Sequence, residues 1–138
     1  MTMPTTDFPF LLDNPRAWRT YLGGSMLDRF HGVPSEGDGH FPEEWILSVV
    51  AARNAGREQF PEEGMSRLRG ADVTLKAVLE SDPAGYLGAG HTDASLGVLT
   101  KLIDSAERLT LQVHPDKPTA MRLFHSPYGK TECWHILD

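Results

Sequence analysis

The sequence predicts an α+β chain that is mainly β, with short helices between the strands. Residues 43–54 (EEWILSVVAARN) and 109–114 (LTLQVH) combine period-two alternation with β-branched or apolar side chains, as strands do. Residues 130–138 (KTECWHILD) are aromatic and β-branched enough to form another strand. Segments with helical spacing are short, because glycine and proline interrupt them.

The composition predicts one globular domain over residues 1–138, with an extended lead-in over residues 1–15 that carries three prolines. Hydrophobic residues make up 40% of the chain and charged residues 23%, which is typical of a soluble globular protein. The net charge of −6 argues against a sequence-independent hold on nucleic acid, because such binding needs a basic surface.

Cys133 is the single cysteine, which excludes an internal disulfide framework and fits a reducing compartment. No apolar run approaches the roughly 18 residues needed to span a bilayer. The first 15 residues lack the basic start and apolar core of a signal peptide. We therefore expect a cytoplasmic protein without a membrane partner.

In the first half of the chain, Asn14-Pro15 predicts the start of a short helix or turn over residues 16–22, which Gly23 and Gly24 end. A second short amphipathic segment, residues 25–31, ends at Gly32. Residues 33–42 have loop composition and precede the strand at 43–54. Residues 54–61 are a turn-rich connection.

In the second half, apolar spacing within residues 72–85 predicts a short helix that Asp82-Pro83 closes, followed by a glycine-rich loop over residues 85–97. Residues 98–113 are ambiguous, because Leu99, Leu102, Ile103 and Ala106 have helical spacing. A strand is favoured for residues 109–114. Residues 118–125 predict a short helix with Pro118 at its start, ahead of the strand at 130–138.

The stretch 109–118 (LTLQVHPDKP) contains His-Pro-Asp, the signature tripeptide of J-domain cochaperones. The helix that precedes the tripeptide in that family is markedly basic, whereas residues 98–113 carry no net charge. Pro127 and Gly129 also interrupt the continuous helix that should follow. A J-domain-like cochaperone is therefore the weaker interpretation.

The same stretch supports a metal site. On a strand, Gln112 and His114 project to one face and offer an amide oxygen and an imidazole nitrogen. Glu132 shares a face with Trp134 and Ile136, where a buried carboxylate needs a partner such as a cation held between the two strands. The alternative is a surface Gln-x-His with a solvated glutamate at a sheet edge.

The segments LTLQVHPDKP (109–118) and YGKTECWHILD (128–138), in that order, resemble the type I mannose-6-phosphate isomerases. These are zinc-dependent enzymes of the cupin superfamily. RTYLGGSMLDRF (19–30), PEEWILSVVAARN (42–54) and TLKAVLESDPAGYLG (74–88) extend the resemblance over most of the chain. It implies the N-terminal portion of a cupin β-sandwich, or jelly roll, in which one Zn²⁺ or another divalent ion assists aldose–ketose isomerisation.

The resemblance also implies roles for particular residues. Gln112, His114 and Glu132 match three of the four zinc ligands. Lys130 matches a lysine of the active site, which we expect to act in proton relay or oxyanion support. Lys101 and Thr110 match substrate-binding positions. An alternative for the neighbouring Asp116 is that it caps the helix at 118–125.

In the family pattern, the fourth zinc ligand and a catalytic arginine lie beyond the position that Asp138 matches. We therefore expect a phosphorylated-sugar site with little isomerase turnover in these 138 residues. A non-catalytic cupin-type module that binds a metal or a sugar is the main alternative. An unpaired strand edge would also favour self-association.

Overall fold

The structure, a computed structural model, describes residues 9–137. The chain divides into two compact units, unit 1 up to Arg108 and unit 2 from Leu109 onward. Most of the expected lead-in, residues 1–8, lies outside the described residues, as does Asp138. The expectation of a single domain stays a prediction.

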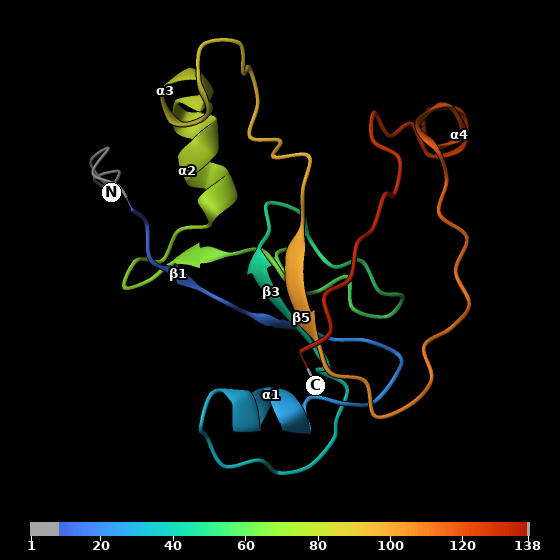
Figure 1. The fold of residues 1–138 in the computed structure, drawn as a ribbon. Helices are drawn as coiled ribbons and strands as arrows, with labels where there is room; N and C mark the ends of the chain where they lie inside the picture. The colour runs from blue at the N-terminus through green and yellow to red at the C-terminus, as the bar shows by residue number, and fades with distance from the viewer. Residues whose placement is uncertain (1–8, 138) are drawn as a thin grey trace. The chain divides into compact units, whose positions relative to one another are not determined.

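Two small antiparallel sheets form the β part of unit 1 (Figure 1). The larger has the order β2-β3-β5, with β2 at Arg16–Ala17, β3 at Glu43–Leu47 and β5 at Thr100–Ile103. The smaller pairs β1, Leu12–Asp13, with β4, Arg67–Leu68. In the larger sheet β3 pairs with β2 on one side and with β5 on the other, where Trp45 lies opposite Lys101. Segments that are far apart in the sequence thus pair with the same central strand.

The strand expected over residues 43–54 is confirmed for its first five residues and then stops. The hydroxyl of Ser48 donates to the carbonyl of Val50 at 2.7 Å and accepts from the Val50 amide at 3.2 Å. These local bonds replace ladder bonds and bend the chain away from the sheet. The turn-rich connection over residues 54–61 is confirmed.

Three short helices belong to unit 1: α1 at Ser25–Phe30, α2 at Leu75–Ser81 and α3 at Pro83–Leu87. The Thr74 side chain caps α2 by accepting from the Ala77 amide at 3.1 Å. Asp82 ends α2, as expected, and then caps α3. The first residues of the predicted loop at 85–97 therefore belong to a helix. The reason is that Asp82 can cap a new helix and Pro83 suits its first position, although the same pair ends the helix before it.

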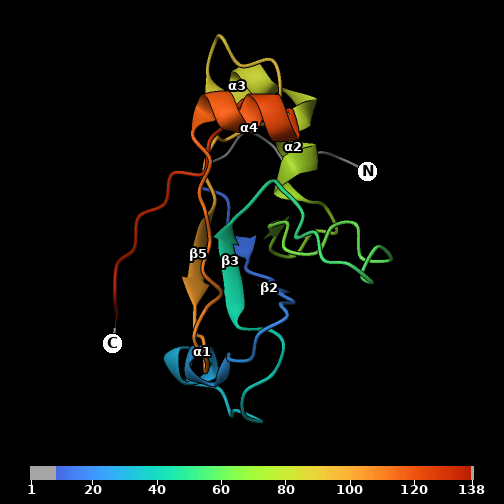
Figure 2. The same ribbon diagram turned by 90° about the vertical axis from the view of Figure 1, so that its right-hand side faces the viewer.

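Helices α2 and α3 lie next to each other (Figure 2), and the main hydrophobic core of unit 1 joins them with Leu12 of β1 and Leu68 of β4. Val78 of α2 is fully buried there, with Val49, Leu68, Leu75 and Leu79 around it. A second cluster joins Ala17, Trp45 and Ala52 on the three-stranded sheet. The apolar spacing that predicted α2 thus marks its buried face.

One expectation for unit 1 is wrong, and one ambiguous segment is resolved. Residues 16–22 form β2 and irregular chain rather than the expected short helix or turn, because β3 offers Arg16 and Ala17 a backbone partner. Residues 100–103 form β5 despite the helical spacing around them, because the other edge of β3 pairs with them. In both places a sheet edge outweighs weak local propensity.

The described part of unit 2 contains one helix, α4 at Lys117–Phe124, which confirms the helix expected at 118–125. Asp116 caps it by accepting from the Thr119 amide at 2.9 Å, and hydrogen bonds from the Thr119 side chain and from that amide hold the pKa of Asp116 below its usual range. The alternative role for Asp116 is confirmed. The helix ends at His125, which takes the left-handed conformation.

The strands expected at 109–114 and 130–138 do not form in the described residues, where both segments are irregular. A strand needs a ladder partner for its backbone groups. One backbone bond, from the Lys130 amide to the Pro115 carbonyl at 3.0 Å, joins the two segments. Leu111 and Val113 are each 92% exposed, so neither is held by a core.

The described elements confirm the α+β class, as a mixture of short helices and small antiparallel sheets. The helices hold more residues than the strands, against the expectation of a mainly β chain. None of the helices described is long and apolar enough to cross a membrane.

Val78→Ala should lower the free energy of unfolding by about 2 kcal/mol, since it removes buried methyl groups and leaves a cavity. Val98→Ala makes the same chemical change at an exposed position and should cost less than about 0.5 kcal/mol. Urea unfolding followed by circular dichroism measures both. Equal losses in the two variants would contradict this account of the core.

Candidate functional site

Four of the six predicted site residues lie together in unit 2. The Lys130 ammonium donates to Gln112 Oε1 at 2.6 Å and lies 3.2 Å from His114 Nε2. Its Nζ also lies 3.5 Å from Glu132 Oε2, and that oxygen lies 2.7 Å from His114 Nε2. We call these four side chains the Lys130 cluster.

The chain on either side of α4 brings the cluster together. Gln112 and His114 are two residues apart in extended chain, so both reach Lys130 while the intervening Val113 points to solvent. Gly129 allows the second segment to approach, because a Cβ there would lie 3.0 Å from both the Lys117 nitrogen and the Pro115 oxygen. Lys130 is the next residue, and the hydrogen bond from its backbone amide to the Pro115 carbonyl holds it in place.

The Lys130 cluster is only partly buried. The side chains of His114 and Glu132 are 32% and 23% exposed, and that of Lys130 is 47% exposed. Water therefore screens the charges, and the contacts are individually weak. The same exposure leaves the donor atoms accessible to a ligand from solution.

The donor set fits a divalent metal ion. An amide oxygen, an imidazole nitrogen and a carboxylate oxygen all lie within 3.5 Å of one point, the Lys130 nitrogen. Zinc takes such nitrogen and oxygen ligands, and a catalytic zinc site uses three protein ligands and one open position. The 2.7 Å contact of His114 with Glu132 would need to open only to about 3.3 Å around a tetrahedral ion.

Across residues 9–137, no three His, Cys, Asp or Glu side chains converge as a metal site would require. An ion held by three side chains of the Lys130 cluster would therefore use the amide of Gln112 as its third ligand. His, Cys and acidic residues alone therefore do not mark this candidate metal site. The Gln-x-His spacing in the sequence is the signal that finds it.

The other two predicted site residues, Thr110 and Lys101, are not members of the Lys130 cluster. Thr110 is exposed. Lys101 belongs to β5 of unit 1, where its ammonium lies 3.3 Å from Glu43 Oε2.

Glu43 is the centre of a second polar cluster, which the sequence analysis did not single out. It is 4% exposed. Its carboxylate accepts from the Tyr21 hydroxyl at 2.5 Å and from Trp45 Nε1 at 2.8 Å, and it pairs with the Arg19 guanidinium at 2.9 Å. A charged residue amid apolar neighbours on a predicted strand is the signal that could have found it.

Electrostatics confirm how strongly Glu43 is held. Burial alone would raise the pKa of Glu43, but hydrogen bonds from Arg19, Tyr21 and Trp45, with the nearby charge of Lys101, lower it to about 2. Burial and the bond to Glu43 raise the pKa of the Tyr21 hydroxyl far above its usual value. Lys101 is therefore oriented by a carboxylate that stays ionised over the whole physiological range.

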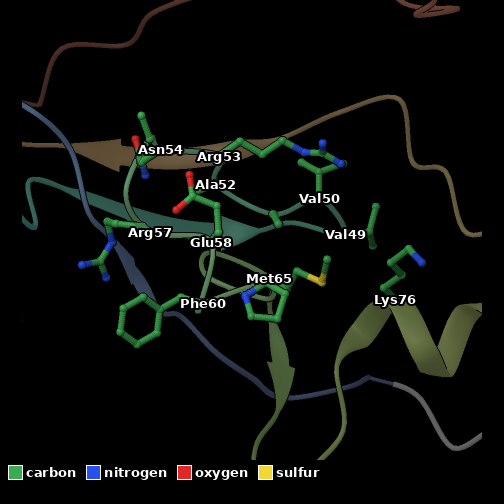
Figure 3. A pocket seen from close by; sticks show the side chains of 13 residues that line it. Val49, Val50, Ala52, Arg53, Asn54, Arg57, Glu58, Phe60, Met65 and Lys76 are labelled. Atoms are coloured by element: carbon green, nitrogen blue, oxygen red, sulfur yellow. The ribbon is translucent and has the colours of Figure 1, made fainter.

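A cavity of about 800 Å³ opens beside the end of β3 in unit 1 (Figure 3). Phe60, Met65 and Lys76 are part of its wall. Arg57, also on the wall, bonds Glu63 at 2.6 Å and lies over the Phe60 ring, so its charge is already paired. None of the predicted site residues lines this cavity.

Comparison with known proteins identifies relatives of one kind. The chain is 30% identical over 132 residues to a probable mannose-6-phosphate isomerase, GmuF, of Bacillus subtilis, covering 94% of this chain and 38% of the relative. It is 29% identical to the putative mannose-6-phosphate isomerase YvyI of the same organism, over 96% of this chain and 38% of YvyI. A mannose-6-phosphate isomerase of Streptococcus mutans is 27% identical, with coverage of 84% and 33%.

The resemblance to mannose-6-phosphate isomerases is thus confirmed over most of this chain. The chain spans little more than a third of the length of these relatives. No protein-family profile matches it, and no solved structure gives a significant match.

Glu43 should make folding sensitive to acid. Because its folded-state pKa is about 2, below its usual 4.5, the unfolded chain binds more protons between these values. Stability that is present above pH 4.5 should therefore be lost as the pH falls toward 2, by roughly 2–3 kcal/mol. Unfolding by urea at a series of pH values measures the slope.

Glu43→Gln should flatten this pH dependence, although it also lowers stability at neutral pH by weakening the ion pairs. Glu36→Gln, at an exposed position, should retain the wild-type slope. Parallel slopes for wild type and Glu43→Gln would show that another group governs the acid transition.

Proposed function

We propose that this chain holds the metal-binding part of a mannose-6-phosphate isomerase site, which interconverts mannose 6-phosphate and fructose 6-phosphate. The convergence of Gln112, His114 and Glu132 on one point carries the proposal. The curated relatives support the choice of reaction, because their names state that activity.

Gln112, His114 and Glu132 would hold Zn²⁺ or another divalent ion. A bound metal of this kind acts as a Lewis acid that stabilises negative charge developing on a sugar oxygen. The partial exposure of His114 and Glu132 leaves room for a substrate to approach.

Lys130 is the proposed catalytic residue. Moving a proton between C1 and C2 of the sugar builds charge on an oxygen, and an ammonium group can donate a hydrogen bond to it. The Lys130 ammonium is half-exposed and already faces acceptor atoms, so it can turn to a substrate without leaving a buried partner.

Lys101 and Thr110 are the proposed substrate-binding residues. A phosphorylated sugar needs cations to bind its phosphate. The Glu43 carboxylate fixes the direction of the Lys101 side chain, which supports a positioning role for that ammonium. Thr110 offers an exposed hydroxyl in the segment that leads to Gln112.

We propose further that the chain forms part of a cupin β-sandwich. Leu111, Val113, Trp134 and Ile136 are exposed apolar side chains on the two segments that carry the cluster. Pairing with additional strands, from a longer chain or a second copy, would bury them and satisfy the backbone. A cytoplasmic location is part of the proposal, since the one cysteine, Cys133, is free and exposed.

A non-catalytic module that binds a metal or a sugar is the second candidate. Among residues 109–137, no further carboxylate or imidazole bonds to the Lys130 cluster, so the described contacts assign no general base. A J-domain-like function has less support, because the residues before His114 form β5 and irregular chain where that family has a helix.

The purified chain, loaded with Zn²⁺ and desalted, should retain about one zinc ion per chain by elemental mass spectrometry. Gln112→Ala, His114→Ala and Glu132→Ala should each weaken zinc binding at least about tenfold, since each removes one ligand. His135→Ala, an exposed histidine outside the cluster, is the matched control for His114→Ala. Zinc retention that ignores all three ligand substitutions would rule out this site.

The zinc-loaded chain should bind mannose 6-phosphate saturably but convert it to fructose 6-phosphate below about 1 s⁻¹, the low end for enzymes. The physical reason is the lack of an assigned base within the described cluster. Calorimetry measures binding, and a coupled assay of fructose 6-phosphate measures turnover. Faster turnover that is lost in Lys130→Met would establish the complete isomerase, and binding with no turnover at all would favour the binding module.

A further inference from the structure

The Lys130 ammonium lies among the three side-chain atoms that would bind a metal ion. Its three neighbours are the atoms assigned as metal donors, Gln112 Oε1 at 2.6 Å, His114 Nε2 at 3.2 Å and Glu132 Oε2 at 3.5 Å. A lysine that merely lay beside a metal site would contact one edge of the donor set. Lys130 instead contacts all three donors.

The ammonium and a metal ion would use the same lone pairs. Nε2 of His114 offers a single position, which lies 2.7 Å from Glu132 Oε2 and 3.2 Å from the Lys130 ammonium and cannot coordinate an ion while it makes these contacts. The same holds for the carbonyl lone pair of Gln112 that points at Lys130. Metal binding therefore requires the Lys130 side chain to move out.

We propose that Lys130 is a built-in competitor of the metal, a cation that fills the site in the metal-free protein and is displaced when the ion binds. This inference rests on the proposed metal site. It gives Lys130 a second role besides the proposed catalytic one. The ammonium keeps the three metal-donor atoms close together before a metal binds. An incoming cation must compete with the ammonium for those atoms.

Removing the ammonium has two opposing effects on metal affinity. It abolishes the contacts that hold the donors together, which should weaken binding. It also abolishes the competition and the repulsion between a lysine and a doubly charged ion. The second effect is larger, because hydrogen bonds between half-exposed groups contribute little, whereas the repulsion scales with the charge of the ion.

The test compares Lys130→Met with Lys117→Met. Both variants remove one lysine charge from unit 2, but Lys117 begins α4 and is not part of the cluster. Zn²⁺ affinity is measured at fixed pH and ionic strength by competition with a chromophoric chelator. We expect Lys130→Met to bind Zn²⁺ about tenfold or more tightly than wild type, and Lys117→Met to stay within about twofold.

Lys130→Arg keeps the charge and should show no gain in zinc affinity. Equal or weaker affinity in Lys130→Met, while wild type binds zinc through Gln112, His114 and Glu132, would overturn the competition and leave the proposed site intact. Zinc binding by neither wild type nor Lys130→Met would overturn both. Binding by Lys130→Met alone would be the strongest support for the competition.

Discussion

The carboxylate of Glu43 is the interaction on which unit 1 depends most. It lies on the central strand of the three-stranded sheet and receives hydrogen bonds or ion pairs from Arg19, Tyr21, Trp45 and Lys101. These partners come from β3 itself, from β5 and from the segment after β2. One buried charge thus joins three stretches of chain that are far apart in sequence.

Such a centre stabilises the fold only while it is complete. Burying a carboxylate costs several kcal/mol, and here the donors around it offset that cost. The loss of one cationic partner would leave a buried charge partly unpaired, which typically costs about 3–5 kcal/mol. Glu43 and its partners therefore specify the arrangement of β3 and β5 more than they add net stability. The Glu43 carboxylate also holds Lys101 in one direction, as the substrate-binding role that we propose for this lysine requires.

The sequence predicted those elements whose cause is local. Helix α2 follows from its apolar spacing and from the cap at Thr74, and α4 follows from Pro118 and the cap at Asp116. Each cap lies next to the helix that it begins. The start of β3 follows from its composition. The pairing of β2 and β5 with β3 could not be predicted, because a strand of two to four residues has little propensity of its own and forms where an edge is free. The ion pairs of Glu43 could not be predicted for a related reason, since its partners Arg19 and Lys101 are distant in sequence.

The Lys130 cluster in unit 2 joins four residues that the sequence analysis named, even though both strands predicted around it are absent from the described residues. Period-two alternation is a property of extended backbone, whether or not a ladder forms beside it. Gln112 and His114 therefore contact the same side chain, Lys130, in irregular chain, while Leu111 and Val113 remain exposed. The close approach at Gly129 and the cap at Asp116 then bring Lys130 and Glu132 to them. Contacts among these donor atoms need only an extended backbone at 112–114 and the close approach of Gly129 to Pro115. Covering the exposed apolar side chains needs a full sheet. The candidate site can thus form its contacts before the surrounding β-sandwich that we propose is complete.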